Sequence, residues 1–198
     1  MNHIASIQQA LREAGLDGWL FYDFRGSDPL AARILKLDPT RHMTRRWYYL
    51  IPAKGTPTKI LHKIEPHSLD DVPGESRLYL SWQEQHAHLK QALASLRQAP
   101  KVCMQYSPMN AIPYVSRVDA GTIELVRSFG VDVVTSADLV QRFEAVWTDE
   151  QYVSHCQAAA ALRQIVDEAF GRVRHEIACG ATFTERDLQQ DILARIAA

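Results

Sequence analysis

The sequence contains few cysteines, and they lie far apart. Its 198 residues include three, Cys103, Cys156 and Cys179, with no close pair among them. An odd number at wide spacing fits neither a disulfide framework nor the paired spacing of a zinc site. We expect three thiols packed as small apolar side chains in a reducing compartment.

The chain also lacks a surplus of either charge and any long apolar run. A formal net charge of −1 argues against a protein that binds nucleic acid or an anionic membrane mainly through bulk electrostatics. No stretch approaches the roughly 18 apolar residues of a transmembrane helix. Residues 1–16 have the pattern of an amphipathic helix and not that of a signal peptide. We therefore expect a cytoplasmic protein without a nucleic-acid or membrane partner.

Common catalytic motifs are absent as well. The sequence contains no Gly-x-Ser-x-Gly, no phosphate-binding Gly-x-x-x-x-Gly-Lys and no Gly-x-Gly-x-x-Gly. His86 and His88 are two residues apart on a predicted helix, so they point in different directions. His62 and His67 flank Glu65, but solvated histidines are a simpler interpretation than a metal site.

What the sequence does contain is an alternation of strand and helix patterns up to about residue 147, which predicts an α/β layered domain. Asp28 precedes Pro29 as a helix N-cap, Ser81 and Glu84 form a capping box, and Ser136 is placed to cap a short helix. The predicted strands cover residues 19–22, 47–51, 58–64, 77–80, 101–106 and 131–134, and the helices 4–16, 28–35, 81–96, 120–129 and 138–143.

The pattern changes after Trp147. Thr148 and Gln151 form a second capping box that begins a helix of about seven turns, and Thr184 caps a last helix. Two amphipathic helices without a sheet cannot bury both apolar faces by themselves. Either they fold back on the first domain, or they begin a second domain whose remainder lies elsewhere. We favour the second interpretation, with domains at 1–147 and 148–198.

Two segments are candidates for contacts. Residues 40–47 hold several arginines before a strand, among them Arg45 and Arg46, and end in Trp47. This segment is either a solvated basic loop or a loop that recognises a carboxylate or another subunit, since arginine and tryptophan dominate interface hot spots. Residues 106–117 form a stiff, aromatic connection that either shapes a turn or lines a site, with Tyr106, Asn110, Tyr114 and Arg117 as candidate residues.

Three long stretches resemble the amino-terminal half of Xaa-Pro aminopeptidases and prolidases, the creatinase-like metallopeptidases with a pita-bread catalytic domain. They are AGLDGWLFYDFRGSDPLA, TRRWYYLIPAKGTPTKILHKIEPHSLDDVPGE and QYSPMNAIPYVSRVDAGTIELVRSFGVDVVTSADLVQRFEAVWTDEQ. The resemblance covers nearly the whole chain and rests on long stretches and element order. It implies a mixed sheet flanked by helices, similar in outline to ribonuclease H, followed by the first helices of the catalytic domain.

The resemblance also implies two divalent metals, of manganese type, in the full-length protein. In the family they are bound by two aspartates ten residues apart, a histidine and two glutamates, all at positions beyond Ala198. Asp138 and Asp149 have that spacing, but each lies at the start of a predicted helix, where a carboxylate interacts with free N–H groups. We therefore expect no catalytic residue, no metal ligand and no cofactor within this chain.

The function implied is subunit assembly and restriction of substrate access. Family members are commonly homo-oligomers that act on proline-containing peptides, and the segment after the first strand leans toward a neighbour's active site. Here that segment contains Phe24, Arg25 and Asp28, with Arg45, Arg46 and Trp47 expected nearby. An arginine can pair with a peptide carboxylate, and a rigid aromatic ring can close a proline-sized pocket.

Two other functions stay open. One is a stand-alone interaction module or pseudoenzyme. The other is a nuclease, which would need three or four carboxylates converging on the sheet to hold magnesium. Asp23 ends the first strand, but Asp70, Asp71 and Asp119 lie in predicted turns.

Overall fold

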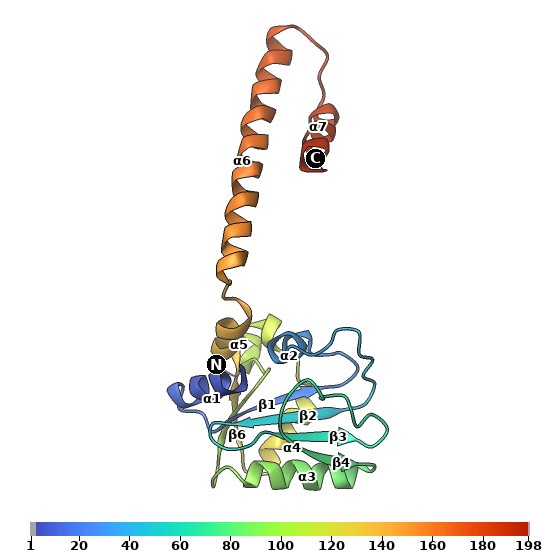
Figure 1. The fold of residues 1–198 in the computed structure, drawn as a ribbon, viewed down its shortest axis with the longest axis vertical. Coiled ribbons are helices and arrows are strands. Elements are labelled where there is room, and N and C mark those ends of the chain that lie inside the picture. Colours follow the sequence, from blue (N-terminus) through green and yellow to red (C-terminus); the bar gives the residue numbers. More distant parts are fainter. Residues whose placement is uncertain (1–2, 198) are drawn as a thin grey trace. The chain divides into compact units, whose positions relative to one another are not determined.

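The structure is a computed structural model that describes residues 3–197, and these fall into two compact units. The units are Met1–Val146 and Trp147–Ala198 (Figure 1). The first contains a mixed sheet with helices, and the second consists of two helices.

The first unit is built on a six-stranded sheet with the order β4-β3-β2-β1-β5-β6. The central strand β1 pairs antiparallel with β2 and parallel with β5, while β5 and β6 are parallel to each other. The β2 and β3 strands form the expected antiparallel hairpin. The strands are β1 (Gly18–Asp23), β2 (Trp47–Pro52), β3 (Thr58–His62), β4 (Glu75–Tyr79), β5 (Lys101–Met104) and β6 (Asp132–Thr135).

Helices cover both faces of this sheet, which gives three layers (Figure 1). One face packs against α1 (His3–Glu13), α2 (Pro29–Leu35) and α5 (Ala137–Glu144), and the other against α3 (Trp82–Ala94) and α4 (Ala120–Ser128). Because side chains alternate along a strand, Trp19 and Phe21 of β1 join the first core while Leu20 and Tyr22 join the second. This explains why the whole of β1 is buried, as its nearly continuous apolar run predicted.

Local signals in the sequence set most helix starts. The Asp28 side chain accepts from the Ala31 N–H, and Ser81 with Glu84 forms the expected capping box. Ser136 is an exception, because it stands at the N-cap of α5 but its hydroxyl caps nothing there. The predicted strands at 77–80 and 101–106 are displaced or shortened in the structure, since β4 begins at Glu75 and β5 ends at Met104.

The second unit consists of α6 (Asp149–Ala178) and α7 (Glu185–Ala197). Thr148 and Gln151 form the predicted capping box of α6, which has 30 residues and so about eight turns, one more than expected. Ion pairs join the helices, with Arg172 Nη1 at 2.6 Å from Asp191 Oδ1 and Arg195 bonded to Glu168.

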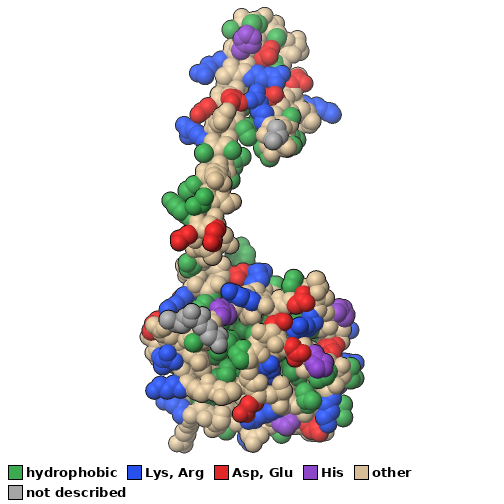
Figure 2. Space-filling view, in the orientation of Figure 1, with side chains coloured by type: hydrophobic (Ala, Val, Ile, Leu, Met, Phe, Trp, Pro, Cys, Tyr) green, Lys and Arg blue, Asp and Glu red, His purple; other side chains and the backbone are tan. Residues whose placement is uncertain are grey.

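Beside these ion pairs the two helices leave an apolar groove. Phe170 in this groove is 67% exposed, and Ala169 is the one buried hydrophobic residue of this unit within residues 147–197. Figure 2 shows apolar side chains at the surface of these helices in green. The groove is lined by Leu162, Ile165, Val166, Ala169, Phe170, Leu188, Ile192 and Ile196. None of the helices in residues 3–197 combines the length and apolar character needed to cross a membrane.

Candidate functional site

The candidate site begins at the loop that follows β1. The buried carboxylate of Asp23 accepts from the N–H of Gly26 at 2.9 Å and of Asp28 at 2.8 Å. Arg25 has φ +60° and Gly26 has φ +75°, so two successive residues lie in the left-handed region. A non-glycine residue pays a conformational cost there, which persists only where the surroundings hold it. Asp23 is therefore a structural anchor that holds Phe24 and Arg25 in one conformation.

Two guanidinium groups contact the ring of Phe24. The Cζ of Arg25 lies 5.6 Å from the ring centroid and the Cζ of Arg46 lies 5.4 Å from it. The antiparallel pairing of Asp23 with Trp47 brings the two segments together. Phe24 is 39% exposed, and neither arginine forms an ion pair with a carboxylate of residues 3–197. We call Phe24, Arg25 and Arg46 the Phe24 surface: an exposed ring with two cations available for an anion.

Tyrosines of the second core lie next to this surface. Tyr79 Oη donates to the backbone carbonyl of Arg46 at 2.7 Å, and the rings of Tyr22 and Tyr48 are 5.1 Å apart. Burial raises the pKa of Tyr22 and of Tyr48, and the nearby Arg46 only partly opposes this. The Tyr22 and Tyr48 hydroxyls therefore stay neutral at physiological pH and contribute no charge. The Tyr79 hydroxyl is the one that fixes the backbone of Arg46.

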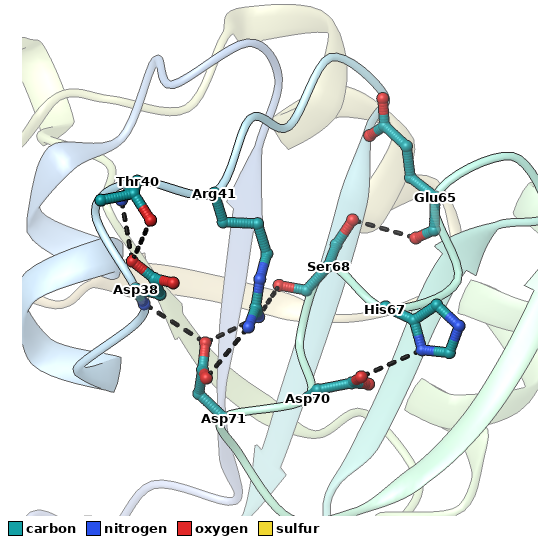
Figure 3. Close-up of polar contacts among 8 residues, drawn as sticks. All are labelled: Asp38, Thr40, Arg41, Glu65, His67, Ser68, Asp70 and Asp71. Atoms are coloured by element: carbon teal, nitrogen blue, oxygen red, sulfur yellow. Dashed lines mark hydrogen bonds and ion pairs between the residues drawn. The ribbon is translucent and has the colours of Figure 1, made fainter.

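The segment before β2 is fastened to the loop that follows β3 (Figure 3). Arg41 forms a two-pronged ion pair with Asp71, at 2.7 and 3.1 Å, and also donates to the Ser68 carbonyl at 3.1 Å. The Glu65 carboxylate accepts from the N–H groups of Thr44 and Arg45. Residues 40–47 are thus not a free solvated loop, because side chains of the loop after β3 bind them. Arg41 is not available to bind a partner, since Asp71 already pairs with it.

His62 and His67, which were considered as metal ligands, have other partners in this region. His67 Nδ1 lies 3.0 Å from Asp70 Oδ2, while His62 accepts from the Ile64 N–H and packs its ring against Tyr79. Within residues 3–197, no group of three His, Cys, Asp or Glu side chains could hold a metal ion.

The second candidate segment, residues 106–117, follows β5. Because β5 is parallel to β1, this segment leaves the same edge of the sheet as the Phe24 loop. It contains two short 3-10 turns, η1 (Pro108–Asn110) and η2 (Pro113–Val115). Met109 and Asn110, both in η1, have φ of 52° and 55°. Tyr114 is 79% exposed and accepts through its carbonyl from Arg117 Nε. Apolar side chains therefore point into solvent from a fixed turn.

The structure brings most of the candidate residues to one edge of the sheet. Arg117 is close enough to Asp28 for a favourable electrostatic interaction. Tyr106 is instead turned toward α4, where the Arg127 guanidinium lies 5.0 Å from its ring. Sequence reasoning passed over Met109 and Ile112, which are among the exposed apolar residues of this edge. The sequence around them is a run of turn-forming residues, and such a run does not indicate which side chains face outward.

Two candidates are buried. Trp47 is 1% exposed and packs in the core beside α2, so its side chain offers no contact surface in this conformation. Asp28 is also buried, as the N-cap of α2. Burial raises the pKa of Asp28 to about 6, with the neighbouring Asp23 adding to the rise and N–H donors and Arg117 opposing it.

We expect Asp28 to make the protein less stable as the pH rises. Its folded pKa lies above its unfolded value, so its stabilising effect is complete below about pH 4 and is lost as the pH passes through 6. The loss is about 3 kcal/mol. Asp28→Asn keeps a good N-cap without the titration. Urea unfolding at pH 4 to 7 should therefore give a flatter profile for Asp28→Asn.

Asp138→Asn is the matched control, because this aspartate lies exposed in the first turn of α5. Its profile should follow that of the unmodified chain. Parallel profiles for Asp28→Asn and the unmodified chain would contradict the assignment.

No protein-family model and no curated protein matches the sequence. Among solved structures, a prolidase from Thermococcus sibiricus matches 98% of this chain with a TM-score of 0.58 and 15% identity, and 48% of that chain is covered. Dipeptidase PepE from Mycobacterium ulcerans gives the same coverage with a TM-score of 0.55 and 20% identity. The creatinase/prolidase N-terminal domain of an X-Pro dipeptidase from Streptococcus pyogenes is covered over 95% of its length by 70% of this chain, with a TM-score of 0.51 and 12% identity.

These likenesses confirm the predicted fold class, a mixed sheet flanked by helices as in the creatinase/prolidase N-terminal domain. At such low identities they establish the fold and not an activity. The chain spans about half the length of the prolidase and of dipeptidase PepE.

Proposed function

We propose that this chain is the amino-terminal, non-catalytic part of an Xaa-Pro dipeptidase or aminopeptidase, acting in the cytoplasm. Its fold is that of the N-terminal domain of an X-Pro dipeptidase, of which 70% of this chain covers 95%. A longer prolidase matches 98% of this chain, so the likeness extends beyond that domain. The two metals of manganese type would be bound by residues outside this chain, because the described residues do not fit a metal site.

The role we propose for the first unit is subunit assembly and control of access to a neighbouring active site. The observation that carries this proposal is the Phe24 surface, where an exposed ring meets two guanidinium groups from neighbouring segments, neither of them in an ion pair within residues 3–197. The exposed Met109 and Tyr114 at the same edge add apolar contact area. A second copy of the chain and a proline-containing peptide, through its terminal carboxylate, are the partners we propose.

The test uses a longer version of the chain that includes the proposed catalytic part. Arg25→Ala and Arg46→Ala should each raise KM for Xaa-Pro substrates about tenfold, since a charge-assisted hydrogen bond contributes about 1.5–3 kcal/mol. Phe24→Ala should weaken subunit association in sedimentation velocity. Lys90→Ala is the control, because this exposed lysine lies on α3 and takes no part in the contacts of the Phe24 surface.

Unchanged KM and unchanged association in all three variants would show that the Phe24 surface has no such role. The alternative, a stand-alone interaction module, would gain support if the extended version had no peptidase activity at all.

A further inference from the structure

A groove of about 720 Å³ lies at the opposite end of the sheet from the Phe24 surface. It is bounded by the turns after α1 and α3 and by the β2–β3 turn, next to the paired residues Gly18 and Pro52. Its size lies within the range of about 300–1,000 Å³ that is typical of small-molecule sites. None of the candidate residues considered above lines it.

The groove carries an excess of positive charge. Arg12, Lys54 and Arg97 line it from three separate segments, and Asp17 is its one carboxylate. Asp17 Oδ2 already accepts from Arg97 Nε and from the Lys101 N–H, each at 2.7 Å. Burial opposes its ionisation, but these two donors outweigh burial and lower the pKa of Asp17. Asp17 is therefore neutralised by Arg97 and leaves the other two cations uncompensated.

Neither of these two cations forms an ion pair within residues 3–197, although Glu13 has an attractive electrostatic interaction with Arg12. Arg12 Nη1 donates to the Ala53 carbonyl at 2.8 Å, a neutral acceptor. Glu13, the acid next to it, is bonded to Arg142 at 2.6 Å. The Lys54 ammonium forms no ion pair or hydrogen bond with the residues described.

The β2–β3 turn adds backbone donors to these charges. Gln8 Nε2 donates to the carbonyls of Pro52 at 2.9 Å and Gly55 at 2.8 Å, which holds the turn against α1. The N–H groups of residues 54–56 donate to no acceptor within residues 3–197. Fixed N–H groups beside cations are what an oxyanion requires, since they need little rearrangement on binding.

We propose that this groove binds a phosphate monoester. A phosphate dianion matches the two uncompensated cations, and its three terminal oxygens match several N–H donors. Leu16 and Leu96, which also line the groove, supply apolar surface for the organic part of the ligand. A monocarboxylate carries one negative charge and would neutralise only one of the two cations.

Phenyl phosphate is the probe, titrated into the 198-residue chain at constant ionic strength and followed by amide NMR shifts. Shifts should concentrate at residues 12–17, 53–56 and 95–97. Phenyl phosphate should bind at least tenfold more tightly than inorganic phosphate or benzoate. Lys54→Gln should weaken binding at least tenfold without altering the fold, because this exposed side chain forms no hydrogen bond or ion pair within residues 3–197. Lys90→Gln should leave binding unchanged.

Arg12→Gln is a second variant, expected to weaken binding to a similar extent. The proposal is overturned if benzoate binds as tightly as phenyl phosphate, if Lys54→Gln and Arg12→Gln both bind like the unmodified chain, or if the shifts spread evenly over basic residues elsewhere.

Discussion

The 198-residue chain, supplied with manganese, should release no product from Xaa-Pro dipeptides or tripeptides. In the metallopeptidases that this chain resembles, bound metals activate the water that attacks the peptide bond. Residues 3–197 contain no group of side chains able to hold such a metal. Without it, the rate should fall to that of the uncatalysed reaction, at least about a million-fold below an active enzyme.

The assay measures proline released per mole of protein over several hours, with a metal-loaded prolidase as positive control. Trace contamination is the main alternative source of turnover, so any signal is followed through a second purification. Activity that co-purifies with the chain and scales with its concentration would contradict the prediction. It would also show that metal ligands can assemble from residues that lie apart in this structure.

The sequence predicted the helices and strands of both units well wherever the signal is local. The apolar run at residues 19–22 is a strand buried on both faces, and the caps at Asp28, Ser81 and Thr148 begin helices. Each of these depends on side chains within a few residues of one another. The Ser136 hydroxyl was predicted to cap in the same way, but it is buried without a hydrogen-bond partner in the structure.

The candidate site was harder to predict because its contacts are long-range. The arginines of residues 40–47 look equivalent in sequence. Arg41, however, forms an ion pair with Asp71, thirty positions away, while Arg46 contacts Phe24 because β1 and β2 are paired. Trp47 resembles an exposed aromatic after two arginines. Strand alternation with Tyr49 turns it toward the first core instead. Register and tertiary partners decide such cases, and no local pattern encodes them.

In limited proteolysis, the second unit should be cleaved much faster than the first. The first unit has two apolar cores that together include most of the buried hydrophobic residues, whereas the second has one such residue within its described part. Local opening of a segment with little buried apolar surface costs little free energy. Residues 145–148 lie outside any helix or strand and are exposed. Chymotrypsin should therefore cut first at Trp147 and at exposed aromatic residues of α6.

The expected product is a fragment ending near Trp147 that survives about a hundred times longer than the intact chain. A difference of roughly 3 kcal/mol in opening free energy between the units would give this factor. Trp147→Ala should slow the first cut and leave cleavage at Phe170 in the groove unchanged. A chain ending at Val146 should unfold within a few degrees of the full chain, because both cores lie within it. Equal resistance of both units, or loss of cooperative unfolding in the shortened chain, would mean that the second unit contributes to the stability of the first.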